Sequence, residues 1–229
     1  MADSADDRDI RVGVDARAGR GASPAAESLR REFPYLETPS SRDLSVVERQ
    51  ISRQPRGRVS VAARCPRGLP AVILTPPFEA DGDRMPPLLW LSCPRVARET
   101  ARLESEGAAA GFAERLRSER GAQELFARDE ERFARAFSLA ASGSGEAFAE
   151  RLGERGAAGG RKGAVKCLHA HVAYRLAAAP SQELETRLSA ADQTVDIAEP
   201  PGLLGRWCVE ELEKRSGLWC ERIPEACVD

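Results

Sequence analysis

Hydrophobic residues recur at helical spacing early in the chain. They predict a helix over residues 42–53, with a stripe formed by Leu44, Val47 and Ile51. Ser41 or Asp43 can cap the start of this helix, because short polar side chains accept hydrogen bonds from free backbone N–H groups. Pro55 and Gly57 end it.

The hydrophobic period then shortens to that of strands. Apolar and polar residues alternate over 59–64, and short apolar runs follow at 71–75 and 88–92. Proline, glycine and polar residues separate the three segments. The connections are short, so the segments predict an antiparallel meander.

From Pro94 onward the pattern is helical. The predicted helices cover residues 94–107, 108–120, 123–141, 164–179, 182–190 and 205–215. The predicted fold class is therefore α+β, with a three-stranded antiparallel meander packed against a predominantly helical remainder.

The chain divides into three parts by composition. Residues 1–24 contain few large apolar side chains and predict a disordered tail. Residues 25–179 predict one α+β domain with an insert rich in Ala, Arg and Glu at about 108–161. Residues 180–229 predict a helical, cysteine-containing extension.

Composition also limits the classes of function. Lys and Arg number 34 and Asp and Glu 36, a formal net charge of -2, which argues against nucleic acid as a partner. No apolar run approaches the roughly 18 residues of a membrane span, and the N-terminus lacks the apolar segment of a signal peptide. We expect a cytoplasmic protein whose six cysteines are thiols or metal ligands.

Both histidines of the chain lie close to a cysteine in the segment 159–176. On a regular helix Cys167 and His171 are four residues apart and share a face. His169 joins Cys167 only if the helix begins near Leu168 and leaves Cys167 in the entering loop. Both histidines are therefore candidate ligands.

Basic residues surround the start of the same predicted helix. They are Arg161, Lys162 and Lys166. Free N–H groups in the first turn of a helix bind anions, so this segment predicts a site for a phosphate-type anion. The alternative is an ordinary solvated loop.

Two further cysteines follow strands. Cys65 ends the first strand and Cys93 the third, and these two strands of a meander run in the same direction. Their ends lie at one edge of the sheet, where the helix that Cys167 opens can dock. Three thiolates and the imidazole of His169 or His171 suit tetrahedral zinc. The alternative is ordinary core packing of the cysteines.

The remaining cysteines lie in the C-terminal part. Cys208, Cys220 and Cys227 are a second possible ligand cluster, although their spacing matches no C-x-x-C pattern.

Three motifs in order carry a resemblance to a known family. They are VAARCPRGLPAVILTPP, PLLWLSCPR followed by RLESEG, and GAVKCLHAH. Over about Val47 to Leu176 the chain resembles the bacterial family DUF501, whose function is unknown. The resemblance implies that four candidate ligands occupy motif positions: Cys65, Cys93, Cys167 and His169.

Two classes of function follow from these residues. The first is a zinc-binding domain with a structural role, or one that binds an anion or a partner. The second is a zinc- or thiol-dependent hydrolase, in which Cys167 would be activated by the helix N-terminus and Lys166. The reaction, the substrate and the partner do not follow from the sequence.

Overall fold

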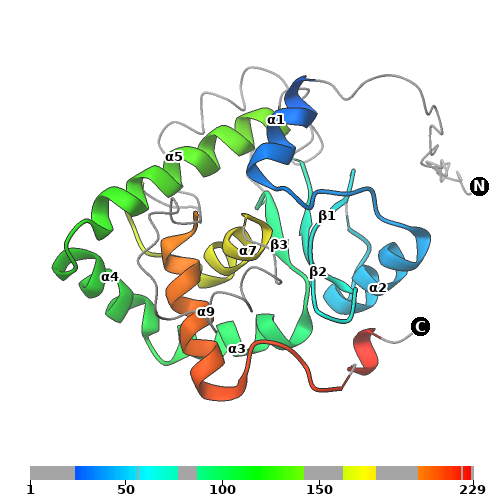
Figure 1. Ribbon diagram of the computed structural model, residues 1–229. Coiled ribbons are helices and arrows are strands. Elements are labelled where there is room, and N and C mark those ends of the chain that lie inside the picture. Colours follow the sequence, from blue (N-terminus) through cyan, green and yellow to red (C-terminus); the bar gives the residue numbers. More distant parts are fainter. Residues whose placement is uncertain are drawn as a thin grey trace, which may run out of the picture.

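The computed structural model describes residues 24–55, 57–76, 87–141, 162–178, 201–222 and 224–227. It has the predicted α+β class: a three-stranded antiparallel sheet packs against a larger helical part (Figure 1). The predicted tail at 1–24, except its last residue, and the predicted helix at 182–190 lie outside the described residues.

The sheet confirms the predicted meander. Strands β1 (Ser60–Arg64), β2 (Pro70–Leu74) and β3 (Leu89–Leu91) lie in the order β1-β2-β3, and both pairs are antiparallel. Every residue of the central strand β2 is buried. This burial explains why β2 reads as an uninterrupted apolar run rather than as an alternation.

Helix α2 (Ser41–Ile51) confirms the first predicted helix, but its cap lies one residue earlier than expected. The hydroxyl of Ser40 accepts a bond from the Asp43 N–H at 3.1 Å, and the Asp43 carboxylate accepts one from the Ser40 N–H at 2.9 Å. Ser40 and Asp43 therefore form a reciprocal capping box, which satisfies two backbone donors at the start of the helix.

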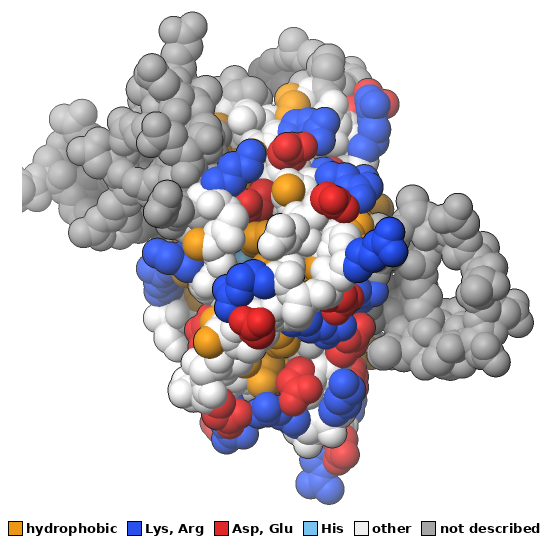
Figure 2. Space-filling model, turned by 90° about the vertical axis from the view of Figure 1, so that its left-hand side faces the viewer, with side chains coloured by type: hydrophobic (Ala, Val, Ile, Leu, Met, Phe, Trp, Pro, Cys, Tyr) orange, Lys and Arg blue, Asp and Glu red, His pale blue; other side chains and the backbone are white. Residues whose placement is uncertain are grey.

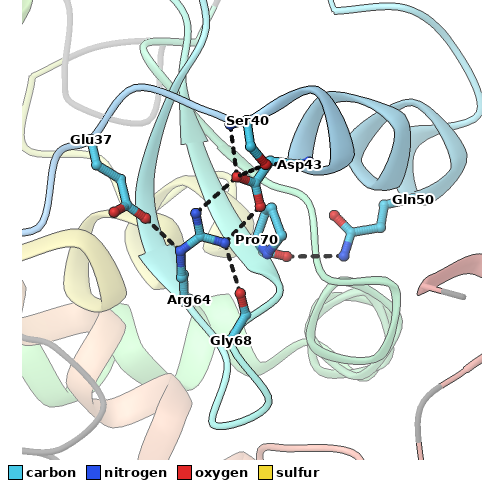
Figure 3. Close-up of polar contacts among 7 residues, drawn as sticks. All are labelled: Glu37, Ser40, Asp43, Gln50, Arg64, Gly68 and Pro70. Atoms are coloured by element: carbon cyan, nitrogen blue, oxygen red, sulfur yellow. Dashed lines mark hydrogen bonds and ion pairs between the residues drawn. The ribbon is translucent and has the colours of Figure 1, made fainter. Parts of the chain in front are cut away.

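The Asp43 carboxylate also holds Arg64, at the end of β1 (Figure 3). The two guanidinium NH2 groups donate to the two carboxylate oxygens at 2.7 and 3.0 Å. The same side chain donates to Glu37 and, at 2.7 Å, to the carbonyl of Gly68 in the β1–β2 turn. One guanidinium thus ties α2, the segment before it and the turn together.

Three helices continue the chain after the sheet. They are α3 (Pro94–Ser105), α4 (Ala108–Ser118) and α5 (Ala122–Ala140). In α3, Val96, Thr100 and Leu103 are buried, which is one apolar face at helical spacing. The predicted insert begins within this part, yet α5 contributes Phe133 and Phe137 to the main core.

Helix α1 (Pro24–Glu32) was not predicted. It packs on α5, and Phe33, just beyond its end, is completely buried. The rings of Phe33 and Phe133 meet the Tyr174 ring edge-on, with centroids 6.2 and 5.5 Å away. The Tyr174 hydroxyl donates to Glu32 at 2.6 Å, so α1 is held by both apolar and polar contacts.

Helix α7 (Leu168–Ala178) lies at the centre of the molecule, between the sheet and the surrounding helices (Figure 1). Eight of its residues are buried: Leu168, His171, Val172, Ala173, Tyr174, Arg175, Leu176 and Ala177. A helix buried on most of its circumference explains the nearly continuous apolar segment in this part of the sequence.

The last long helix, α9 (Leu203–Ser216), packs directly on α7. At Gly205 the two backbones approach so closely that an added Cβ would lie 2.2 Å from the His171 carbonyl oxygen. The start of α9 is capped from α5, because the Asp129 carboxylate accepts from the N–H groups of Gly202 and Leu203 at 2.9 and 2.7 Å. Residues after α9 return toward α2 and end in the short 3-10 helix η2 (Glu225–Cys227).

Charges are interspersed on the face that carries α4, where Figure 2 shows basic and acidic side chains side by side. Arg115 pairs with Glu119 at 2.6 Å within α4, and Arg102 pairs with Glu99 at 3.0 Å within α3. None of the helices in the described ranges combines the length and the hydrophobicity that a bilayer span requires.

Substituting Gly205 tests the close approach of α7 and α9. We expect Gly205→Ala to lower the free energy of unfolding by about 1–3 kcal/mol or more, because the methyl group displaces the α7 backbone. The matched control is Gly111→Ala in α4, where an added Cβ meets nothing within 4 Å. This control should be neutral or stabilising by up to about 1 kcal/mol. Equal effects in urea unfolding would contradict the assigned packing.

Substituting Asp43 tests the clamp on Arg64. The hydrogen bonds from Arg64 hold the Asp43 pKa well below its usual value. As the pH falls, Asp43 is therefore protonated in the unfolded chain before it is protonated in the folded protein. The stabilisation is therefore complete above about pH 5 and is lost as pH falls below about 4. We expect Asp43→Asn to lower the free energy of unfolding at pH 7 by about 1–3 kcal/mol.

The control for this pair is Glu37→Gln, which removes the more exposed partner of Arg64 and should cost less than about 1 kcal/mol. Chemical unfolding at several pH values is the measurement. A wild-type advantage over Asp43→Asn that does not shrink between pH 5 and 2 would show that the carboxylate charge is unimportant.

Candidate metal centre

The start of α7 decides which histidine joins Cys167. The helix begins at Leu168, so Cys167 lies in the entering loop and His169 lies in the first turn. This is the arrangement in which His169 rather than His171 was expected to join the cysteine. The Cys167 carbonyl accepts from the Ala170 N–H at 3.1 Å, which sets the loop against the first turn.

A third residue reaches the same point from α3. The carboxylate of Glu104, near the end of that helix, accepts a bond from the Leu168 N–H and lies 3.2 Å from Nδ1 of His169. One ligand atom from each of Glu104, Cys167 and His169 lies within 4.8 Å of the other two. Carboxylate, thiolate and imidazole together are ligands that zinc accepts.

Glu104 was absent from the predicted ligand set. It is the first glutamate of the RLESEG motif, which follows the third strand in the sequence. The signal was therefore present in the motif, but nothing in the local spacing links a residue on α3 to one that lies more than sixty positions later.

The second nitrogen of His169 is held by the backbone. Nε2 lies 3.0 Å from the carbonyl oxygen of Ala97, two helical turns before Glu104 on α3. A carbonyl only accepts, so Nε2 carries the hydrogen. In a neutral ring Nδ1 is then the free ligand atom, and a backbone carbonyl on the other nitrogen is the usual orientation of a metal-binding histidine.

The electrostatics of the group attract a cation. The hydrogen bond with Cys167, followed by the charge of Glu104, raises the pKa of His169 to about 9 although burial opposes the shift. The same hydrogen bond lowers the pKa of the Cys167 thiol. A metal ion bound here would replace the proton that the thiol and the imidazole share.

Solvent reaches the group. Cys167 is exposed, and the side chains of His169 and Glu104 retain 31% and 33% of their accessible surface. A metal held by these three residues would keep a coordination position for water or a substrate.

His171 lies elsewhere, in the core. It is 6% exposed, its ring packs against Phe126 with centroids 5.8 Å apart, and burial lowers its pKa to about 4. His171 is therefore uncharged in the folded protein at neutral pH. His171 is a core residue and is absent from the group of Glu104, Cys167 and His169.

The predicted zinc ligands are divided between two places. Cys65 and Cys93 do lie near one another, as their strand directions predict, but they line a cavity with Cys220 and Cys227. Neither belongs to the described ligand group that contains Cys167. The strands bring their ends to one edge, whereas α3 carries the chain from Cys93 to Glu104 along its whole length before it reaches the start of α7.

The expected C-terminal cluster is also divided. Cys208 is completely buried on α9, whereas Cys220 and Cys227 lie in the segment that follows it. Burial raises the pKa of the Cys208 thiol. Cys208 is therefore a core residue, and the other two belong with Cys65 and Cys93.

At the expected anion site, a carboxylate of the protein lies beside the helix start that the sequence predicts to be free. Lys162 and Lys166 are exposed, and Arg161 lies outside the described residues. The Leu168 N–H at the start of α7, which was expected to be free for an anion, already donates to Glu104. The Glu104 carboxylate thus accepts from one of the N–H groups that would otherwise bind an anion.

The comparisons with known proteins identify a family and no activity. Residues 61–184 match the model of DUF501, a family described as proteins of unknown function. This match covers more than half of the chain. No curated protein and no solved structure matches the chain. The chain therefore belongs to the DUF501 family.

The two imidazoles are expected to titrate far apart in metal-free protein, because one is paired with charged groups and the other is buried without them. Proton NMR in the presence of a chelator should give His169 a pKa near 9 and His171 one near 4. Glu104→Gln should lower the former and leave the latter unchanged, and Glu106→Gln should change neither. Two titrations near the ordinary value of about 6.5 would contradict the assigned surroundings.

Proposed function

We propose that this DUF501 protein binds one zinc ion through Glu104, Cys167 and His169. The observation that carries the proposal is the convergence of three ligand atoms within 4.8 Å, contributed by α3, the entering loop and α7. The bond from His169 to the Ala97 carbonyl supports it, because this bond orients the ring and leaves Nδ1 for the metal.

An open coordination position on the proposed zinc ion would suit the site to hydrolysis. Structural zinc sites are usually closed by four protein ligands, whereas sites with three leave a place for water or substrate. Zinc in such a site lowers the pKa of a bound water to about 7. Lys162 and Lys166 are exposed beside this loop, so a substrate with an anionic group, such as a phosphate, fits the charge of the surroundings.

Thiol catalysis by Cys167 is the second candidate, since the Cys167 pKa is lowered and the thiol is exposed. A thiol–imidazole–carboxylate relay uses opposite nitrogens of the ring for the thiol and the carboxylate. Here Glu104 faces Nδ1 and the Ala97 carbonyl is bonded to Nε2. The nitrogen opposite the carboxylate is thus bonded to a backbone carbonyl rather than left to the thiol alone, and this favours metal binding.

Metal analysis of variants tests the proposal. Wild-type protein purified without chelator should contain about one zinc per chain, and Glu104→Gln, Cys167→Ser and His169→Gln should each weaken zinc binding. Loss of a direct ligand should exceed the roughly 10–100-fold effect of losing an outer-shell partner. Competition with a chromophoric chelator measures the change.

The controls are Glu106→Gln and Cys208→Ala, which alter the same residue types outside the group and should keep the wild-type zinc affinity. Cobalt substitution adds a spectroscopic test, because a thiolate–cobalt charge-transfer band should appear in wild type and be absent in Cys167→Ser. Folded wild-type protein without zinc affinity, together with rapid alkylation of Cys167, would reject the metal centre in favour of thiol chemistry.

A further inference from the structure

Four of the six cysteines surround one cavity at the edge of the sheet. Cys65 follows β1 and Cys93 precedes α3, while Cys220 and Cys227 come from the segment after α9 and from η2. The cavity has a volume of about 190 Å³. Figure 1 shows how the C-terminal segment runs back from α9 toward α2.

These four cysteines share a cavity, and Cys93 also belongs to the main core. A cysteine in a packed core touches its neighbours and leaves few voids larger than a water molecule. Here the four side chains line a common hollow instead, and all four are free thiols. Three parts of the chain thus bring cysteines to one cavity.

The spacing of the sulfur atoms exceeds what one zinc ion requires. With Zn–S bonds of about 2.3 Å, four tetrahedral thiolates lie about 3.8 Å from one another. Among the described residues, no three of these thiols form a ligand group within 4.8 Å. A cofactor of several atoms holds its ligands farther apart and fills the space between them.

The walls of the cavity suit a thiolate-bound cofactor. Pro66, Pro70 and Trp219 supply apolar surface that limits the access of water. The Gln50 amide donates to Cys227 Sγ at 3.4 Å. Hydrogen bonds to sulfur stabilise thiolates in iron–sulfur proteins and tune the cofactor potential.

Positive charge lies on the outer side of the same thiols. Arg67 lines the cavity together with Cys220, and Arg95 lines a neighbouring hollow with the same cysteine. Arg95 also donates to the carbonyl of Gly217 at 3.0 Å, and Arg67 donates to that of Glu221, so both side chains hold the C-terminal segment in place. A cofactor with four thiolate ligands carries net negative charge, which these arginines offset.

We propose that Cys65, Cys93, Cys220 and Cys227 ligate an iron–sulfur cluster. Four cysteines are the ligand set of both [2Fe–2S] and [4Fe–4S] clusters. When a preformed cluster is transferred, each thiol loses its proton to solvent and forms one Fe–S bond in place of a ligand of the donor, so no iron changes its oxidation state. The site is distinct from that of the proposed zinc ion, because it shares no residue with Glu104, Cys167 and His169.

Anaerobic reconstitution of the full chain with iron, sulfide and thiol tests the proposal. We expect a brown protein with iron and acid-labile sulfide in equal amounts, about two or four of each per chain, and with visible absorption of sulfur-to-iron charge transfer. Iron content and Mössbauer spectra distinguish the two cluster types. Folded protein that takes up no iron and sulfide, or that binds one zinc through these four cysteines, would overturn the proposal.

Variants assign the ligands. Cys227→Ser changes a residue close to the end of the chain and should lose most of the cluster while the far-UV circular dichroism keeps the wild-type shape. Cys93→Ser should do the same, although it alters the start of α3. Retention of the full chromophore in both variants would overturn the assignment.

The controls are Cys208→Ala and His169→Gln, which should keep the cluster. Zinc affinity of Cys227→Ser at the site of Glu104, Cys167 and His169 is measured in parallel. A failure of the zinc site leaves the iron content unchanged, and a failure of the cluster leaves the zinc affinity unchanged, so the two proposals are tested separately.

Discussion

The burial of helix α7 is the constraint on which the rest of the structure depends. Eight residues of this short helix are buried, so it needs neighbours on almost every side. The sheet, α3 and α9 supply them, and Gly205 allows α9 to approach without a side chain between the two backbones. Isolated helices of this length are marginal in water, so α7 is stable chiefly because these elements enclose it.

The start of such a helix poses a separate problem, because its first N–H groups need partners. Glu104 solves part of it by accepting from the Leu168 N–H, and the same carboxylate faces His169. A residue that satisfies a helix terminus therefore also contributes to the candidate metal centre. This dual role explains why the centre lies where α3 ends against α7, rather than at the edge of the sheet.

The sequence predicted most of the helices and strands, but it predicted fewer of the contacts between residues that are distant in the chain. Period and turn residues predicted the meander, α2, α3 and α5 closely, because these depend on local patterns. Helix α1 escaped prediction, since its packing on α5 and the contact of Phe33 with Tyr174 involve helices distant in sequence. The charge-rich segment around it resembles a solvated chain when read alone.

The candidate ligands show the same limit. That Cys65 and Cys93 approach one another follows from strand direction, and that His169 can join Cys167 follows from the helix start. Neither the arrival of Glu104 nor the return of Cys220 and Cys227 has a local signature. Both depend on how α3 and the segment after α9 cross the molecule, which is set by packing.

X-ray absorption at the zinc edge of the wild-type protein tests the central claim most directly, because it counts ligand types without altering the chain. A centre formed by Glu104, Cys167 and His169 predicts one sulfur at about 2.3 Å, with nitrogen and oxygen ligands at about 2.0–2.2 Å. A shell dominated by sulfur would place zinc among the cysteines at the sheet edge instead. That result would contradict the assignment of the metal to the start of α7.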